Sequence, residues 1–115
     1  MPPAKLDLQK QPAAADNSLI IRLNGKLSFE NVHDFLAAMR QEVAAHLILD
    51  MSGLVFLDSA GVGTLVTLFV SRRKHGKTLA LAALTMQGAA VLQVAGLLKL
   101  LPVYPSVEQA LSQRK

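Results

Sequence analysis

Residues 47–81 read LILDMSGLVFLDSAGVGTLVTLFVSRRKHGKTLAL, and the spacing of their apolar residues changes twice along the run. Leu47–Leu49 is apolar at every position, which is typical of a central strand covered on both faces. From Ser59 to His75 the apolar residues recur at helical spacing, and Gly76 is suited to the C-terminal cap. A second strand is predicted at 78–84. Strand, helix and strand in this order are the unit of an α/β fold with a parallel sheet.

The same alternation is predicted on both sides of this run. Residues 18–25 form a short apolar strand that is expected to leave into a turn at Asn-Gly, and residues 5–9 can pair with it as an antiparallel hairpin. Ser28 is predicted to cap a helix, since one helical face collects the apolar residues Phe29, Val32, Phe35, Leu36, Met39 and Val43.

The C-terminal part of the chain continues this alternation. A small-residue helix is predicted at 86–95, followed by a strand in the later part of 97–104 and a short helix that begins at Pro105 and Ser106. The fold class predicted for the whole chain is α/β, with a mixed sheet of four or five strands and about four helices. The sheet is expected to be mostly parallel with a leading antiparallel hairpin.

The length and composition limit what kind of protein this is. A chain of 115 residues, 51% hydrophobic and 17% charged, suits one globular domain at 1–115, with its core in 18–113 and partly loop or an N-terminal strand in 1–17. The absence of cysteine excludes disulfides and thiolate metal sites. No secretory signal and no membrane-spanning apolar run is recognisable, so a cytoplasmic location is predicted.

The net charge of +4 raises nucleic-acid binding as a lesser alternative. The densest basic run is 72–77, at the predicted end of a helix, where cations complement the helix dipole without any ligand. Three other motifs do not predict a ligand site. The HGKT at 75–78 ends like a phosphate-binding loop but leads into a strand instead of a helix, and the GVGT at 61–64 lacks the third glycine of a dinucleotide-binding motif. The three histidines lack the spacing of metal ligands. Neither a cofactor nor a metal is therefore predicted.

Ser59 stands at the start of the central helix, and three roles are open to it. As an N-cap its hydroxyl would accept a backbone N–H. As a nucleophile it would need a histidine base, and no Gly-x-Ser-x-Gly elbow supports that reading, so an enzyme is not predicted. As a modified residue it could carry a phosphate, which free amides and the dipole at a helix N-terminus favour.

The whole run at 47–81 resembles the STAS domain of bacterial anti-sigma factor antagonists, and the likeness extends from about Ser18 to the final helix. Its most specific part is an apolar residue followed by Asp-Ser-Ala-Gly, here residues 57–61, and GLLKLLPVYPSVEQAL at 96–111 resembles the closing strand and helix. In that family the matching serine is phosphorylated by an anti-sigma factor that is also a serine kinase. The resemblance implies that Ser59 is the acceptor and that Asp50 is the usual acid at the end of the central strand.

The resemblance also implies a surface that contacts the partner. Around the acceptor we assign to it Asp58, Ser59, Ala60, Gly61, Val62 and Leu65. A second patch is expected in the loop before the first helix, at Asn24, Lys26 and Ser28. Many members of the family carry acids at the two positions where this chain has Lys26 and Ser28.

The function that the resemblance implies is a switch and not an enzyme. The unphosphorylated chain would bind an anti-sigma factor with serine kinase activity and free the sigma factor, phosphorylation of Ser59 would end that binding, and a serine phosphatase would restore it. A monomer or weak homodimer without direct nucleic-acid binding is expected. Within the same fold, the alternative is a scaffold of stress-signalling complexes or a module associated with lipid or anion transporters.

Overall fold

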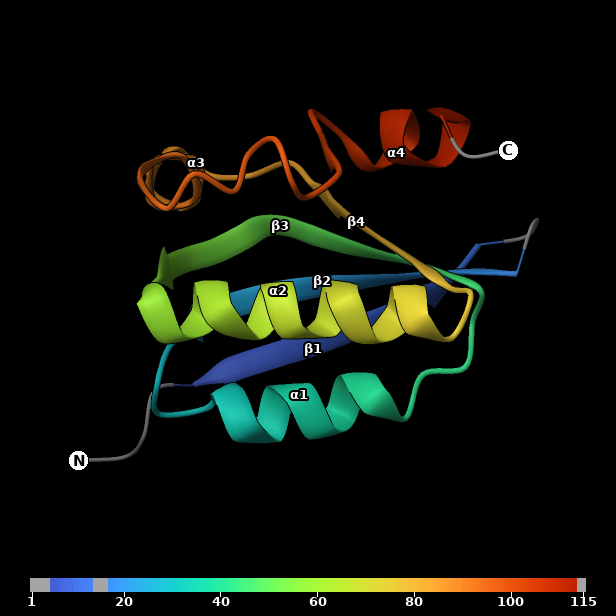
Figure 1. Ribbon diagram of the computed structural model, residues 1–115, viewed down its shortest axis with the longest axis horizontal. Coiled ribbons are helices and arrows are strands. Elements are labelled where there is room, and N and C mark those ends of the chain that lie inside the picture. Colours follow the sequence, from blue (N-terminus) through green and yellow to red (C-terminus); the bar gives the residue numbers. More distant parts are fainter. Residues whose placement is uncertain (1–4, 14–16, 114–115) are drawn as a thin grey trace.

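The computed structural model describes residues 5–13 and 17–113, so residues 1–4, 14–16 and 114–115 of the predicted 1–115 domain lie outside the described residues. The described chain forms one five-stranded sheet with helices on both faces (Figure 1). The elements are β1 (Leu6–Pro12), β2 (Ser18–Leu27), α1 (Val32–Arg40), β3 (His46–Leu57), α2 (Ser59–Lys74), β4 (Thr78–Ala82), α3 (Met86–Val94), β5 (Val103–Tyr104) and α4 (Val107–Gln113).

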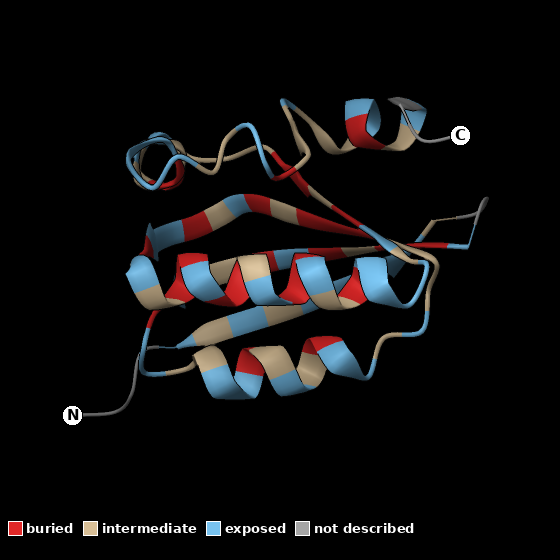
Figure 2. Ribbon diagram, in the orientation of Figure 1, coloured by how far each residue is buried: buried red, intermediate tan, exposed pale blue. Residues whose placement is uncertain are grey.

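The strand order is β1-β2-β3-β4-β5, with β1 antiparallel to β2 and every other neighbouring pair parallel. The predicted α/β fold with a leading antiparallel hairpin is therefore confirmed. β3 lies at the centre, where Leu49 pairs with Ile21 on one side and Leu81 on the other. Leu47 and Leu49 face the main core while Ile48 faces a smaller cluster under α4, and Figure 2 shows this first half of β3 as largely buried.

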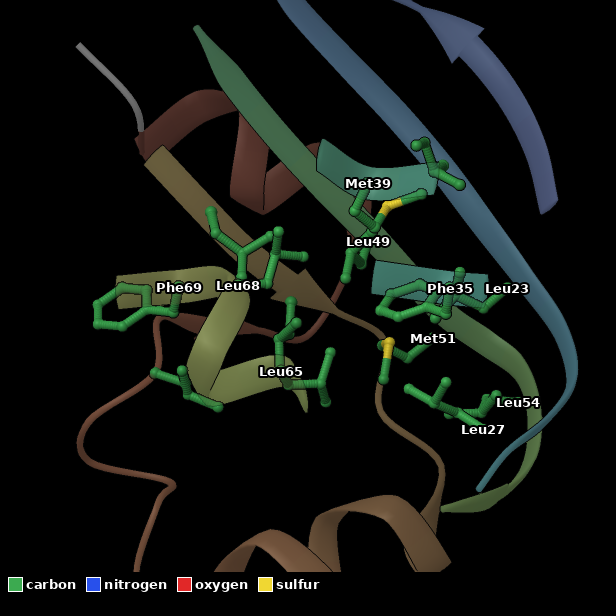
Figure 3. Close-up of a cluster of buried hydrophobic side chains, with 14 of the residues drawn as sticks. Leu23, Leu27, Phe35, Met39, Leu49, Met51, Leu54, Leu65, Leu68 and Phe69 are labelled. Carbon is green, nitrogen blue, oxygen red and sulfur yellow. The ribbon is translucent and has the colours of Figure 1, made fainter. Parts of the chain in front are cut away.

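The main core lies between the sheet and the helices α1 and α2. Phe35 and Met39 enter it from α1, and Leu65 and Leu68 from α2, and their side chains form one cluster with those of Leu49 and other sheet residues (Figure 3). These side chains are almost completely inaccessible to water. Their burial removes apolar surface from contact with water, and this transfer is the main favourable contribution to folding.

The ends of the predicted helices at 59–75 and 105 onward are confirmed. Gly76 follows the last residues of α2 with φ +71°, the left-handed conformation that a glycine adopts at low cost. The Ser106 hydroxyl accepts the N–H of Gln109 at 3.1 Å and so caps α4. Among the described helices, none has both the length and the apolar character needed to cross a membrane.

β2 does not leave into a turn at Asn-Gly, and this part of the prediction is wrong. The strand continues through Gly25 to Leu27, with shifts of register against β3 on both sides of Asn24–Gly25. Gly25 has φ +118°, so the glycine serves an irregularity within the strand and not its end. The segment 24–27 is consequently part of the sheet and not a loop.

The predicted start of the first helix is also wrong. α1 begins at Val32, with Asn31 at the N-cap position. Residues 28–31 form a turn in which the Ser28 carbonyl accepts the N–H of Val32 at 3.1 Å. Phe29 and Val43 lie outside the helix and are 73% and 79% exposed, so they do not belong to its core face. The spacing alone could not show where the helix begins and ends, because Phe29 and Val43 outside the helix happen to continue the helical spacing of its apolar residues.

Candidate functional site

Helix α2 begins directly after β3, and Asp58 is the residue that caps it. The backbone of Asp58 is extended (φ −106°, ψ −177°), and its Oδ1 accepts the N–H of Gly61 at 2.9 Å. Its carbonyl accepts the N–H of Val62, also at 2.9 Å. A carboxylate here satisfies a helix donor and complements the positive end of the helix dipole. The hypothesis that Ser59 is the cap is therefore wrong, because the cap lies one residue earlier.

Ser59 is the first residue of α2, and its side chain is exposed. Within the described part of the chain, its hydroxyl has no hydrogen-bond partner, and neither do the N–H groups of Ser59 and Ala60. Unpaired amides at a helix N-terminus favour an anion placed beside them. The site therefore combines an accessible hydroxyl with surroundings in which a phosphate could be accommodated.

Asp58 also connects α2 to the end of β2. Its second carboxylate oxygen, Oδ2, accepts the N–H of Phe29 at 3.1 Å, and its own N–H donates to the carbonyl of Leu27 at 3.4 Å. Both carboxylate oxygens are thus engaged with backbone donors. The turn that carries the exposed ring of Phe29 is held beside Ser59 by these contacts.

An apolar groove of about 510 Å³ opens on the other side of Ser59. Its lining comes from the start of α2 and from the facing side of α3, namely Ser59, Val62, Gly63, Ala90, Val91, Val94 and Ala95. Val94 is 90% exposed at its edge. The sequence analysis missed this groove, although the small residues Gly63 and Ala90 in its lining are the signal that could have indicated it.

Gln87 fixes α3 against the end of β3. Its side-chain Oε1 accepts the N–H of Leu57, and its Nε2 donates to the carbonyl of Leu57, both at 3.0 Å. Leu57 immediately precedes Asp58, so the wall of the groove that α3 supplies is tied to the start of α2. The sequence analysis missed Gln87, because a glutamine one residue inside a helix carries no signal of such a contact.

A family model for the STAS domain matches residues 5–110 of the chain. The chain belongs to the STAS domain family. The predicted membership is confirmed, and the helix start with its Asp-Ser-Ala-Gly sequence lies inside the matched region.

Individual STAS proteins resemble this one at low identity. An anti-sigma F factor antagonist from Paenibacillus polymyxa is 26% identical over 100 residues, covering 83% of this chain and 85% of the relative. The anti-sigma factor antagonist SpoIIAA, in its unphosphorylated form, superposes with a TM-score of 0.74 at 22% identity, covering 93% of this chain and 95% of its own. SpoIIAA from Bacillus in its phosphorylated form superposes with a TM-score of 0.67 at 22% identity, covering 93% of this chain and 98% of its own.

A different kind of protein shares the fold as well. A sulfate transporter family protein from Wolinella succinogenes superposes with a TM-score of 0.75 at 21% identity, covering 88% of this chain and 87% of its own. At these identities the superpositions show that the STAS fold is shared.

The structure brings together only part of the predicted partner surface of this STAS domain. Ser59 and Asp58 lie at the surface with Ala60, and Val62 lines the groove. Leu65 is 0% exposed and packs in the core, so its side chain supports the helix and cannot contact a partner. Gly61 is buried as well, and the backbone of β2 approaches it so closely that a Cβ there would stand 2.7 Å from the carbonyl oxygen of Leu27.

The second predicted patch is divided by the structure. Lys26 is exposed and pairs with Phe56, two residues before Asp58. Ser28 is only 3% exposed, with its hydroxyl 3.4 Å from the N–H of Glu30, so it faces inward. Asn24 pairs with Gly53, five residues before Asp58, which places it about 16 Å along the strand from the site.

Asp50 also differs from its predicted place. It lies in the middle of β3, where its Oδ1 accepts the N–H of Ser52 at 3.0 Å, and the strand continues to Leu57. It is therefore not at the end of the central strand. Over residues 5–13 and 17–113, no three His, Cys, Asp or Glu side chains are grouped so that they could hold a metal ion.

Proposed function

We propose that this STAS protein is an anti-sigma factor antagonist switched by phosphorylation of Ser59. In this proposal the unphosphorylated chain binds an anti-sigma factor with serine kinase activity in the cytoplasm and so releases a sigma factor. Transfer of phosphate from the kinase's ATP to Ser59 ends the binding, and a serine phosphatase restores it. The chain supplies the acceptor, while nucleotide and magnesium belong to the partner.

The observation that carries the proposal is the position of Ser59 between two apolar surfaces. On one side lies the exposed ring of Phe29, held there through the carboxylate of Asp58. On the other side Ser59 itself lines the groove that ends at Val94. A partner that covers both surfaces would bury apolar area, and its contact would include the serine hydroxyl.

Phosphorylation would change the charge of this surface at its centre. A phosphate adds roughly 1.5 to 2 negative charges at neutral pH, immediately beside the carboxylate of Asp58. Burying these charges against an apolar partner surface is unfavourable unless the partner pairs them. A loss of about 3 kcal/mol would weaken binding more than a hundredfold, which is enough to reverse the choice of partner.

The fold should persist after the modification. The free N–H groups of Ser59 and Ala60 and the helix dipole favour a phosphate at this end of α2. The cap does not depend on the modified hydroxyl, because Asp58 provides it. The switch would therefore act on the interface and leave the folded state in place.

The proposal is tested by calorimetric titration of the cognate anti-sigma kinase with the wild type, Ser59→Ala and Ser59→Asp. Ser59→Ala should bind as well as the wild type and resist phosphorylation. Ser59→Asp should bind at least tenfold more weakly, about 1.4 kcal/mol, because it brings part of the phosphate's charge to the interface. Mass spectrometry after incubation with kinase and ATP should find the phosphate on Ser59.

A matched control is available in Ser112→Asp. Ser112 is exposed on α4, which lies on the other face of the sheet from α2 and away from its start (Figure 1). The same change of charge there should leave binding unaltered. Equal binding by all variants, or phosphate on another residue, would contradict the switch.

The second candidate is a scaffold or transporter-associated STAS module. It is favoured by the likeness in fold to the sulfate transporter family protein and by Lys26 at a position where many antagonists carry an acid. Such a module would function with Ser59→Ala unchanged and would co-purify with a permease or a large complex. Co-purification from native membranes with the wild type and Ser59→Ala separates the two candidates.

A further inference from the structure

A second cavity lies between the C-terminal ends of α1 and α2, about 20 Å along α2 from Ser59. Its volume is about 320 Å³, which is within the range of small-molecule sites. It is lined by Met39, Arg40, Glu42, Leu68, Ser71, Arg72, His75 and Lys77. The apolar part is provided by Met39 and Leu68 of the core, and most of the remaining side chains are basic.

Arg72 is the fixed element of this cavity. Arg72 is only 5% exposed, and its Nε donates to the carbonyl of Thr78 at 2.7 Å while Nη2 donates to that of Ala44 at 2.6 Å. A guanidinium carries five N–H donors, so these two bonds orient the group without exhausting it. The cation is held rigidly at the wall of the cavity, which lowers the entropy lost on binding.

The basic side chains here are not needed to complete the end of α2. The carbonyl of Arg72 accepts the N–H groups of His75 and Lys77, and the carbonyl of Arg73 accepts that of Gly76, so the backbone pairs these helix carbonyls itself. The carbonyl of Ser71 accepts a hydrogen bond from Nδ1 of His75 at 2.8 Å. These helix carbonyls therefore do not require the cationic side chains of Arg40, Arg72 and Lys77 as partners.

The balance of charge in the lining is positive. Three side chains, Arg40, Arg72 and Lys77, are cationic at neutral pH, and Glu42 is the single acid. The carboxylate of Glu42 is already paired with Lys10 of β1. Burial lowers the pKa of Arg72, and the nearby carboxylate of Glu42 acts against this shift.

We propose that this cavity binds a small organic anion, with its phosphate or carboxylate oxygens at Arg40, Arg72 and Lys77 and its apolar body against Met39 and Leu68. Guanidinium and ammonium groups form charge-assisted hydrogen bonds with both head groups. The inference does not depend on the proposed role of Ser59, which lies at the opposite end of α2. The site would give this STAS domain a ligand-responsive surface separate from its partner surface.

The test follows backbone amide shifts by NMR as phenyl phosphate is added to the whole protein. Saturable shifts are expected at 71–77 and 40–44 and not at 58–61, with millimolar or tighter affinity. Inorganic phosphate should bind more weakly, since it lacks the apolar body, and benzyl alcohol should not bind, since it lacks the charge. Titration with benzoate decides whether the site prefers phosphate or carboxylate.

Two variants and one control make the test specific. Arg40→Gln and Lys77→Gln should each weaken the binding of phenyl phosphate about tenfold, while the amide spectrum of the free protein is otherwise preserved. Lys74→Gln removes the same charge from an exposed residue of α2 outside the lining and should have little effect. Absence of saturable shifts, equal binding of benzyl alcohol, or equal weakening by Lys74→Gln would overturn the proposal.

Discussion

The side-chain amide of Gln87 pairs with the backbone N–H and carbonyl of Leu57 in the way that a residue of a neighbouring strand would. Its Oε1 accepts the N–H of Leu57 and its Nε2 donates to the carbonyl, both at 3.0 Å. The last residue of β3 thus gains on one side the partners that β4 no longer supplies, since the pairing of β3 with β4 ends at Asp50. Through this contact the start of α3 is held next to Asp58.

Gln87→Ala should lower the free energy of unfolding by about 1 to 3 kcal/mol, because the N–H and carbonyl of Leu57 lose their partners in a partly buried place. Urea denaturation monitored by circular dichroism measures the change. Gln93→Ala on the exposed side of the same helix is the control and should shift stability by less than about 0.5 kcal/mol. Equal effects of the two changes would show that the contact contributes nothing.

Asp58 and Ser59 should behave differently when each is replaced by alanine. Asp58→Ala removes the acceptor of Gly61 and of the Phe29 N–H, and should cost about 1 to 2 kcal/mol in thermal or urea unfolding. Ser59→Ala should change stability by less than about 0.5 kcal/mol, since its hydroxyl makes no hydrogen bond within the described chain. A larger loss for Ser59→Ala would restore the capping role that the structure assigns to Asp58.

The two glycines of the first turns of α2 provide a matched pair. A Cβ at Gly61 would stand 2.7 Å from both the Leu27 carbonyl oxygen and the Leu57 Cδ1, so Gly61→Ala should destabilise the fold by about 1 to 3 kcal/mol. A Cβ at Gly63 would meet nothing within 4 Å, and Gly63→Ala should be neutral or stabilising by up to about 1 kcal/mol. Differential scanning calorimetry of both variants decides, and a stable Gly61→Ala protein would contradict the close contact.

The central part of the fold could be predicted because its signals are local and strong. The three apolar residues from Leu47 to Leu49 are buried at the sheet centre, and α2 ends before Gly76 as its spacing and glycine indicated. The same reasoning interpreted Gly25 as a turn. A glycine with positive φ is required both in a turn and in an irregular strand, and the pairing with β3 that distinguishes them is not local.

The candidate site could be predicted only where its residues are adjacent in the sequence. Ser59 and Asp58 were identified from adjacent residues, but which of them caps the helix depends on the backbone angles of Asp58. The groove needs α3 to lie against α2, and the burial of Ser28 depends on how residues 28–31 turn. Such contacts between distant segments leave little periodic signal in a single sequence.

The groove beside Ser59 gives the last prediction, which rests on the proposed partner binding. Val94→Asp adds a charge at the edge of the groove, where the side chain is 90% exposed, so the folded protein should keep its stability within about 0.5 kcal/mol. Binding to the anti-sigma kinase should nevertheless weaken at least tenfold, because a carboxylate would be desolvated against an apolar partner surface. Val43→Asp is the matched control, since Val43 is 79% exposed in the segment between α1 and β3 and does not line the groove. Surface plasmon resonance with the immobilised kinase compares them, and equal affinities for Val94→Asp and Val43→Asp would exclude the groove from the partner surface while leaving the Ser59 switch to its own test.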